Sequence, residues 1–243
     1  MYHSISRSSG PTSIPPETFR RQIEALCAYG YRTVPLTAFQ AWLRSEGDLP
    51  AGSIVITFDD GFADFAQSAF PILRDHNYTA TVFLPTGKMG GMEDWQGIDT
   101  ASPRRLMTWP EIADLAKAGI EFGGYSVTHA DLTKLPLKEL RREIRDCRDQ
   151  IERRLGRAPA AFAPPYGRAG NRERQEIRSC FDVSVGTRLE HANQRCDRYD
   201  LPRIEMHYFR DLKRWRVFLE GRGELYFRTR RLLRGFKELA TEK

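Results

Sequence analysis

The chain has 243 residues, enough to bury a substantial core as one α/β barrel or as two small domains. Its hydrophobic content of 40% and charged content of 29% are typical of globular proteins. The sequence contains no run of eighteen or more apolar residues, so we expect no membrane-spanning helix.

The predicted elements alternate between helices and strands. Helices are expected at residues 16–28, 37–43, 63–75, from 109 onward, 137–155 and 171–179, and strands at 33–36, 54–58, 80–84, 120–124 and 182–186. Residues 85–108 form a glycine-rich excursion that is long enough to be a functional loop. Repeated strand–helix units imply parallel strands with right-handed crossovers, and hence an α/β fold.

Two adjacent carboxylates follow the strand predicted at residues 54–58. Asp59 and Asp60 come directly after an apolar, β-branched run, and Gly61 supplies the conformational freedom to leave the strand. The carboxyl ends of parallel strands form the edge at which ligand and catalytic groups collect. One carboxylate can ligate a metal while its neighbour takes a proton from a bound water. The alternative is an ordinary Asp-Gly turn.

Two further stretches favour the chemical interpretation: GGYSVTHADLT at residues 123–133 and FAPPYG at residues 162–167. Together with the acidic turn, they resemble the motifs of the polysaccharide deacetylases of the NodB-homology type, carbohydrate esterase family 4. The resemblance covers residues 1–207 and implies a distorted (β/α) barrel. It also implies hydrolytic removal of an N-acetyl or related acyl group from an amino sugar, by a metal-bound water. The expected partner is an N-acetylated glycan, as a bacterial-type surface polysaccharide or its precursor.

The resemblance implies roles for the polar residues of the first two motifs. Asp59 would be the general base, and Asp60 and His129 would ligate a divalent metal, with zinc as the expected cation. Relatives usually carry a histidine where this chain has Tyr125, and catalytic zinc normally takes three protein ligands. Tyr125 could coordinate as a phenolate, could hydrogen-bond a water ligand near the substrate, or could mark a weak or inactive site. Because a free phenol has a pKa near 10, the water-holding role is favoured.

Two residues outside these motifs could complete the site. His3 belongs to a Tyr-His pair that would lie on the catalytic edge, as a replacement ligand or a substrate contact. The alternative is a partly buried, hydrogen-bonded histidine. Ala163 stands where relatives often have an arginine that orients the base, and Arg203 is the expected substitute because its planar fork suits a carboxylate. The alternative for Arg203 is a surface salt bridge.

The third motif and a late histidine would act on the substrate. Pro164 and Pro165 make a stiff bend that would fix Tyr166 beside the pocket, with Pro165 itself against the substrate. By the resemblance, the backbone N–H of Tyr166 helps to bind the oxyanion, and His207 protonates the departing amine. The remaining histidines have no motif around them and are expected at the surface: His76 and His191.

The last part of the chain differs from the rest in charge. Residues 207–243 hold eleven Lys and Arg against five Asp and Glu, a difference equal to the net charge of +6 of the whole chain. We therefore predict a deacetylase-like domain at residues 1–207 and a basic, partly amphipathic helical extension at 208–243. Its apolar face would comprise Leu225, Leu232, Phe236 and Leu239. Such a helix could bind an anionic membrane surface or a lipid-linked glycan, or its apolar face could pack on the barrel.

Other partners and functions can be weighed from the sequence. No recognised binding module accompanies the basic charge, so no nucleic-acid partner is expected. Four widely spaced cysteines without a CxxC pair, and no signal-peptide pattern, predict a cytoplasmic protein, peripheral to the inner membrane if the basic helix binds lipid. One alternative function is a metal-independent amide hydrolase on the same scaffold, which Tyr125 favours. Another is a catalytically silent glycan-binding protein, against which the retained Asp59 argues.

Overall fold

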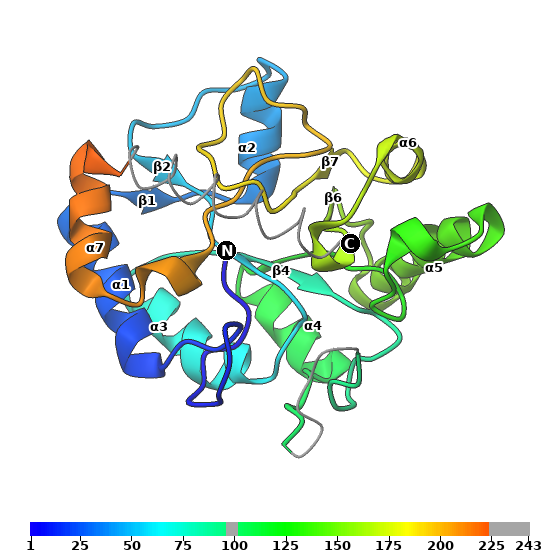
Figure 1. Ribbon diagram of the computed structural model, residues 1–243, viewed down its shortest axis with the longest axis horizontal. Helices are drawn as coiled ribbons and strands as arrows, with labels where there is room; N and C mark the ends of the chain where they lie inside the picture. The colour runs from blue at the N-terminus through cyan, green and yellow to red at the C-terminus, as the bar shows by residue number, and fades with distance from the viewer. Residues whose placement is uncertain (96–101, 224–243) are drawn as a thin grey trace, which may run out of the picture.

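The computed structural model describes residues 1–95 and 102–223, which form an α/β structure around a curled parallel sheet (Figure 1). The strands are β1 (Arg32–Thr33), β2 (Ser53–Ile54), β3 (Thr57–Phe58), β4 (Thr81–Leu84), β5 (Glu121–Gly124), β6 (Ala161–Phe162) and β7 (Val183–Ser184). The α-helices are α1 (Pro16–Ala28), α2 (Leu36–Leu43), α3 (Phe70–Asp75), α4 (Trp109–Lys117), α5 (Leu137–Leu155), α6 (Asn171–Arg178) and α7 (Leu212–Val217). Shorter helical turns span Phe65–Ala69, Leu132–Lys134, Pro165–Gly167, Met206–Phe209 and Phe218–Arg222.

The main sheet has the order β3-β4-β5-β6-β7, and all its neighbouring strands are parallel. Because the strands share one direction, their carboxyl ends lie at the same edge, as the repeated strand–helix units predicted. A separate two-stranded parallel sheet joins β1 to β2. The predicted α/β barrel architecture is therefore confirmed, and the loops after β3, β5, β6 and β7 meet at one edge.

Backbone hydrogen bonds link the two outer strands of the sheet through short irregular segments. The N–H of Tyr2 donates to the carbonyl of Thr57 in β3 at 2.8 Å. On the other side, the N–H of Met206 donates to the carbonyl of Met1 at 3.1 Å, and that of Leu201 to the carbonyl of Ser184 in β7 at 3.0 Å. Residues 1–4 and 201–206 thus close the curled sheet into a distorted barrel.

The strand predicted at residues 54–58 is two strands in the structure. β2 pairs with β1, whereas β3 pairs with β4. Between them, the carbonyl of Ile56 still accepts a hydrogen bond from the N–H of Thr81 at 2.9 Å. The hydrophobic pattern is the same whether one strand continues or the chain passes from one sheet to another, so the sequence pattern could not show the break between β2 and β3.

Other predicted boundaries also differ from the structure, and two of them have a clear local cause or form. The strand predicted at residues 33–36 ends at Thr33, and Leu36 already begins α2, because Pro35 has no N–H to continue a ladder and precedes the helix. The helix predicted at residues 63–75 is a π-helical turn, Phe65–Ala69, followed by α3. Neither difference moves a residue of the predicted site.

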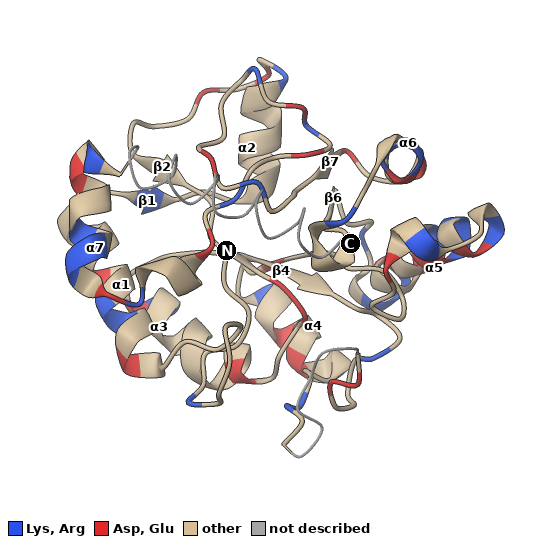
Figure 2. Cartoon of the chain, in the orientation of Figure 1, with Lys and Arg blue, Asp and Glu red and all other residues tan. Residues whose placement is uncertain are grey.

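Helix α5 has its predicted bounds and covers the centre of the sheet. The helix packs on β5, and its buried residues recur every three or four positions: Leu140, Ile144, Cys147 and Ile151. Figure 2 shows acidic and basic residues interspersed along its length. In β5, a Cβ at Gly123 would lie 2.6 Å from the ring of Phe83 and 2.8 Å from the carbonyl oxygen of Ala161. Glycine therefore allows the neighbouring strands to pack closely here.

The described part of the chain after residue 207 packs on α1. The indole Nε1–H of Trp215 in α7 donates to the carbonyl of Gln22 at 3.1 Å, and the Gln22 amide donates to the carbonyl of Phe209 at 2.9 Å. Phe209, Trp215, Phe218 and Leu219 belong to the same hydrophobic core as α1 and β3. Residues 208–223 therefore pack as part of the barrel. Among the described helices, none is both long enough and apolar enough to cross a membrane.

Candidate active site

The acidic pair and the two later motifs meet at the carboxyl edge of the sheet. Asp59 and Asp60 follow β3, and Tyr125 and His129 follow β5. All four side chains are buried. Asp60 and His129 have positive φ angles of 73° and 62°, a conformation that costs energy in residues other than glycine and is concentrated at functional sites. The sequence thus places strained, buried polar groups where parallel folds carry their chemistry.

Arg203 binds Asp59 through two parallel hydrogen bonds. Its Nη1 donates to Oδ1 at 2.6 Å and its Nη2 to Oδ2 at 2.8 Å, while its Nε donates to the carbonyl of Gly186 at 2.8 Å. Asp59 is 1% exposed and Arg203 7% exposed, so the alternative of a surface salt bridge is wrong. Burial, the largest single influence, raises the pKa of Asp59, but Arg203, together with His3 and the amino terminus, brings the pKa below its ordinary value. Asp59 is therefore a carboxylate at neutral pH.

The hydroxyl of Tyr125 lies 3.5 Å from Oδ2 of Asp59, within hydrogen-bonding distance. Burial, together with the negative charges of Asp59 and Asp60, raises the pKa of Tyr125 well above its ordinary value. Without a cation beside it, Tyr125 is therefore a neutral phenol that donates toward the carboxylate.

Asp60 and His129 are positioned to share a cation. Oδ1 of Asp60 lies 3.2 Å from Nε2 of His129, close to the separation of about 3.3 Å between two ligand atoms on one tetrahedral zinc ion. A carboxylate oxygen and an imidazole nitrogen suit zinc chemically. Within residues 1–95 and 102–223, however, no group of three or more His, Cys, Asp and Glu side chains could hold a metal ion. Two protein ligands for a divalent cation, Asp60 and His129, are therefore present among the described residues, and a third protein ligand is not.

Aromatic side chains enclose the imidazole of His129. Trp95 stacks on it with ring centroids 4.2 Å apart and 15° between the planes, and Tyr166 meets it edge-on at 4.9 Å. Two residues before Trp95, the buried carboxylate of Glu93 accepts hydrogen bonds from Arg104 at 2.8 and 2.7 Å. Sequence reasoning placed a functional loop here without singling out Trp95. A tryptophan beside acidic residues in a glycine-rich excursion was the available signal.

A cleft of about 590 Å³ opens onto Asp59 and brings together most of the other predicted residues. His3, Tyr125, Tyr166 and His207 all line it, although they come from four distant parts of the sequence. Tyr166 has a φ of 61° and is 40% exposed, at the tip of the turn that follows β6. Among the described residues, Tyr166 and Gly167 form this part of the wall, whereas Pro165 is buried beneath them. The structure thus does not place Pro165 at the substrate contact predicted for it.

The histidines without a motif lie away from the cleft. His76 is partly buried and its ring lies 6.2 Å from that of Tyr78, so the prediction of a surface position holds only in part. His191 is exposed, as predicted, and stacks on Phe218 with ring centroids 5.5 Å apart.

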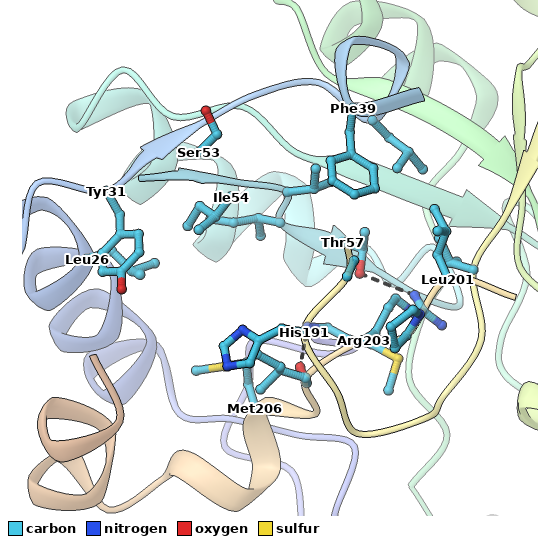
Figure 3. A pocket seen from close by; sticks show the side chains of 18 of the residues that line it. Leu26, Tyr31, Phe39, Ser53, Ile54, Thr57, His191, Leu201, Arg203 and Met206 are labelled. Carbon is cyan, nitrogen blue, oxygen red and sulfur yellow. Dashed lines mark hydrogen bonds between the residues drawn. The ribbon is translucent and has the colours of Figure 1, made fainter. Parts of the chain in front are cut away.

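A second, mainly apolar pocket of about 310 Å³ also reaches Arg203 (Figure 3). Leu26 and Tyr31 lie at one end of it, and Thr57 and Arg203 at the other. The Nη1 of Arg203 donates to Oγ1 of Thr57 at 3.2 Å. The guanidinium that holds Asp59 is therefore also part of the wall of this pocket, which we call the apolar pocket.

Comparison with known proteins gives a consistent result. The sequence pattern of the family described as polysaccharide deacetylase matches residues 46–180, more than half of the chain. YxkH of Bacillus subtilis, whose name places it among polysaccharide deacetylases, is 26% identical over 168 residues. That alignment covers 69% of this chain and 56% of the Bacillus protein, so the chain spans little more than half of that relative.

A second relative and a solved structure cover more of the chain. The poly-beta-1,6-N-acetyl-D-glucosamine N-deacetylase of Staphylococcus aureus is 23% identical over 233 residues, which cover 90% of this chain and 77% of that protein. IcaB from Ammonifex degensii has the same fold, with a TM-score of 0.75 over 90% of this chain and 93% of that chain, at 21% identity. From the match to its sequence pattern, supported by the fold and the buried acidic pair, the chain belongs to the polysaccharide deacetylase family.

Proposed function

We propose that the protein hydrolyses the N-acetyl group of an amino sugar in a glucosamine-containing polysaccharide. The observation that carries the proposal is the pairing of two buried carboxylates with different partners. Asp59 is held as an ion by Arg203, and Asp60 faces His129. Family membership and the names of the relatives support this substrate class.

Asp59 is suited to act as the base. Its two oxygens are fixed by Arg203, and it opens onto the cleft in which a water and an acetyl group would meet. As the water attacks the acetyl carbonyl carbon, Asp59 takes the proton of that water, and a tetrahedral oxyanion forms. Arg203 and the Tyr125 hydroxyl keep the carboxylate in one orientation, which reduces the entropy lost in reaching the transition state.

Deacetylases of this family are generally metal-dependent. Asp60 and His129 would hold the divalent cation, for which we propose zinc, with the third protein position unfilled among the described residues. Such a cation supplies Lewis-acid polarisation of the water and of the acetyl carbonyl. Because only two protein ligands are present, we expect the affinity for the cation to be weak.

The remaining steps use Tyr166 and His207. The turn after β6 brings Tyr166 to the cleft, where its backbone N–H would stabilise the oxyanion. Protonated His207, which lines the same cleft, would give its proton to the sugar nitrogen as the carbon–nitrogen bond breaks. The products are acetate and a free amino sugar.

The test is acetate release from N-acetylated glucosamine oligosaccharides by Asp59→Asn and wild-type protein. An amide cannot accept the proton, so we expect turnover to fall by at least about 10²-fold, the lower range for general-base catalysis. Asp182→Asn is a control, because Asp182 is exposed and makes only a surface contact with Arg44. Equal acetate release by Asp59→Asn and wild type would remove the proposed base.

A metal-independent amide hydrolase is the second candidate, and the hydroxyl that Tyr125 turns toward Asp59 favours it. Acetate release before and after chelation distinguishes the two mechanisms. If activity survives chelation and does not rise with added zinc, the metal-independent mechanism replaces the first. If chelation abolishes activity and added zinc restores it, the metal-independent mechanism is excluded.

Two further proposals, on membrane binding and on cellular location, rest on the sequence alone. Binding to an anionic membrane or a lipid-linked glycan was predicted from residues 225–239, which lie outside the described residues. The cytoplasmic location likewise remains a proposal from the sequence. Sedimentation with anionic vesicles and fractionation of cells would test them.

A further inference from the structure

A single carboxylate on α5 binds the loop that ends in His129, residues 126–129, which we call the His129 loop. Oε2 of Glu143 accepts hydrogen bonds from the backbone N–H of Val127 at 2.8 Å and from that of Thr128 at 2.9 Å. Oε1 of Glu143 accepts a third bond, from the Thr128 hydroxyl, at 2.9 Å. One ionisable side chain thus satisfies two successive backbone donors and a hydroxyl, and bonds to a carboxylate are stronger than bonds between neutral groups.

The backbone that follows β4 binds the same loop through its carbonyl groups. The N–H of Thr86 donates to the carbonyl of Ser126 at 3.1 Å, and that of Gly87 to the carbonyl of Val127 at 2.8 Å. A Cβ at Gly87 would lie 2.9 Å from both Cγ1 and the carbonyl oxygen of Val127, so glycine allows this close approach. The His129 loop is therefore held between the chain after β4 and helix α5.

Both ends of the His129 loop have a strained backbone. Ser126 has a φ of 62°, and so does His129. Such a conformation costs free energy in residues other than glycine and persists only where the surrounding contacts fix it. If Glu143 is removed, the N–H groups of Val127 and Thr128 lose their acceptor, and the contact from α5 no longer opposes the strain. Because His129 follows Thr128 directly, a change in the path of these amides moves the imidazole.

We propose that Glu143 is a positioning residue, which fixes the His129 loop so that Nε2 of His129 stays 3.2 Å from Oδ1 of Asp60. It acts through the backbone of residues 127–128 and needs no contact with the substrate. Since α5 packs on β5, the carboxylate ties the loop to the sheet that carries the site. The inference rests on the proposed role of Asp60 and His129 in holding a cation, but the position of His129 can be measured without a cation or a substrate.

The first experiment measures the reactivity of His129 in the full-length protein after chelation of metals. His129 is 4% exposed, so diethyl pyrocarbonate, which acylates accessible imidazoles, should modify it slowly in wild type. In Glu143→Ala, peptide mass spectrometry should show His129 modified at least about tenfold faster, because the unpaired amides favour local opening of the loop. His76 lies away from the cleft and is the internal control, whose rate should not change. Equal rates at His129 in Glu143→Ala and wild type would overturn the proposal.

Two further variants separate the hydrogen bonds of Glu143 from its charge and from general stability. Glu143→Gln removes the charge but keeps an acceptor oxygen for the two backbone N–H groups, so His129 should react almost as slowly as in wild type. Ile151→Val trims a buried side chain near the other end of α5 and should leave the rate at His129 unchanged. If Glu143→Gln behaves like Glu143→Ala, or if Ile151→Val accelerates the reaction equally, these hydrogen bonds do not position His129.

Calorimetric titration with zinc measures the consequence for the cation. Glu143→Ala should bind zinc at least about tenfold more weakly than wild type, the effect of losing a group that orients a ligand. Glu152→Ala, at a surface pair with Arg148 on the same helix, should bind zinc as wild type does. If His129 becomes reactive in Glu143→Ala while zinc affinity stays the same, the loop does not govern the ligand and the proposal is overturned. If wild type itself binds no zinc, the proposed metal mechanism fails, and the reactivity of His129 still decides whether Glu143 positions it.

Discussion

Arg203 holds a carboxylate that burial alone would tend to protonate. Burial raises the pKa of Asp59, and the Arg203 guanidinium, with smaller contributions from His3 and the amino terminus, brings it below its ordinary value. A carboxyl whose folded pKa lies below its ordinary value stabilises the fold above that ordinary value, and the contribution is lost as the pH falls through the folded pKa. The pair thus adds stability at neutral pH that acid removes.

Replacing this arginine should move the acidic limb of the activity profile. In Arg203→Met, the main group that opposes the effect of burial is gone, so the pKa of Asp59 rises and kcat/KM should begin to fall at a higher pH than in wild type. Loss of the partner also leaves a buried charge, which should cost about 3–5 kcal/mol of stability. A pH profile of kcat/KM checks the first effect and urea unfolding the second. Arg142→Met, at an exposed pair with Asp146, should leave the acidic limb in place.

Tyr125 accounts for the incomplete ligand set. Tyr125→His would offer an imidazole beside Asp60 and His129, so calorimetric titration with zinc should show affinity increased by at least about tenfold, the effect of even an outer-shell partner. Tyr125→Phe removes the hydroxyl without adding a ligand and should show no such gain. Unchanged affinity in Tyr125→His would mean that the ring at this position does not reach the cation.

At the scale of elements, the excursion after β4 carries a residue that touches the site. Trp95 stacks on His129, and two residues earlier Glu93 forms an ion pair with Arg104. An aromatic stack is worth about 0.5–1.5 kcal/mol, so Trp95→Ala should lower kcat/KM by about 2–10-fold and weaken zinc binding to a similar degree. Trp95→Phe should recover most of both losses. If Phe restores neither, the indole does not act by stacking on the imidazole.

The elements also show what the sequence could and could not predict. The bounds of α5 were predicted correctly because its apolar residues keep a helical period over nineteen residues. The division of residues 53–58 between two sheets was not predicted, because the strands that pair with β2 and β3 lie elsewhere in the sequence. Asp59, Asp60 and His129 were placed together by motifs, whereas the stack of Trp95 on His129 depends on loop conformation, which periodicity does not encode.

On the scale of the whole molecule, α7 is part of the barrel's support. Trp215 is buried against α1 and joined to it by a hydrogen bond to Gln22, so Trp215→Ala should lower the free energy of unfolding by about 3–5 kcal/mol. Val217 on the same helix is 44% exposed, and Val217→Ala should change the free energy of unfolding by less than about 0.5 kcal/mol. Urea unfolding compares the two. If Trp215→Ala lowers the free energy of unfolding as little as Val217→Ala does, α7 contributes little to the core.

Closure of the barrel through residues 1–4 and 201–206 sets an order in which the chain can fold during synthesis. Tyr2 can pair with β3 as soon as residue 58 has left the ribosome, but the backbone bond from Met206 to Met1 must wait for about 150 more residues. At 5–20 residues per second, this wait lasts roughly 7–30 s. Throughout that time the first segment is paired on one side only, and binding of its open side by a chaperone would compete with aggregation until residues 201–206 close the barrel.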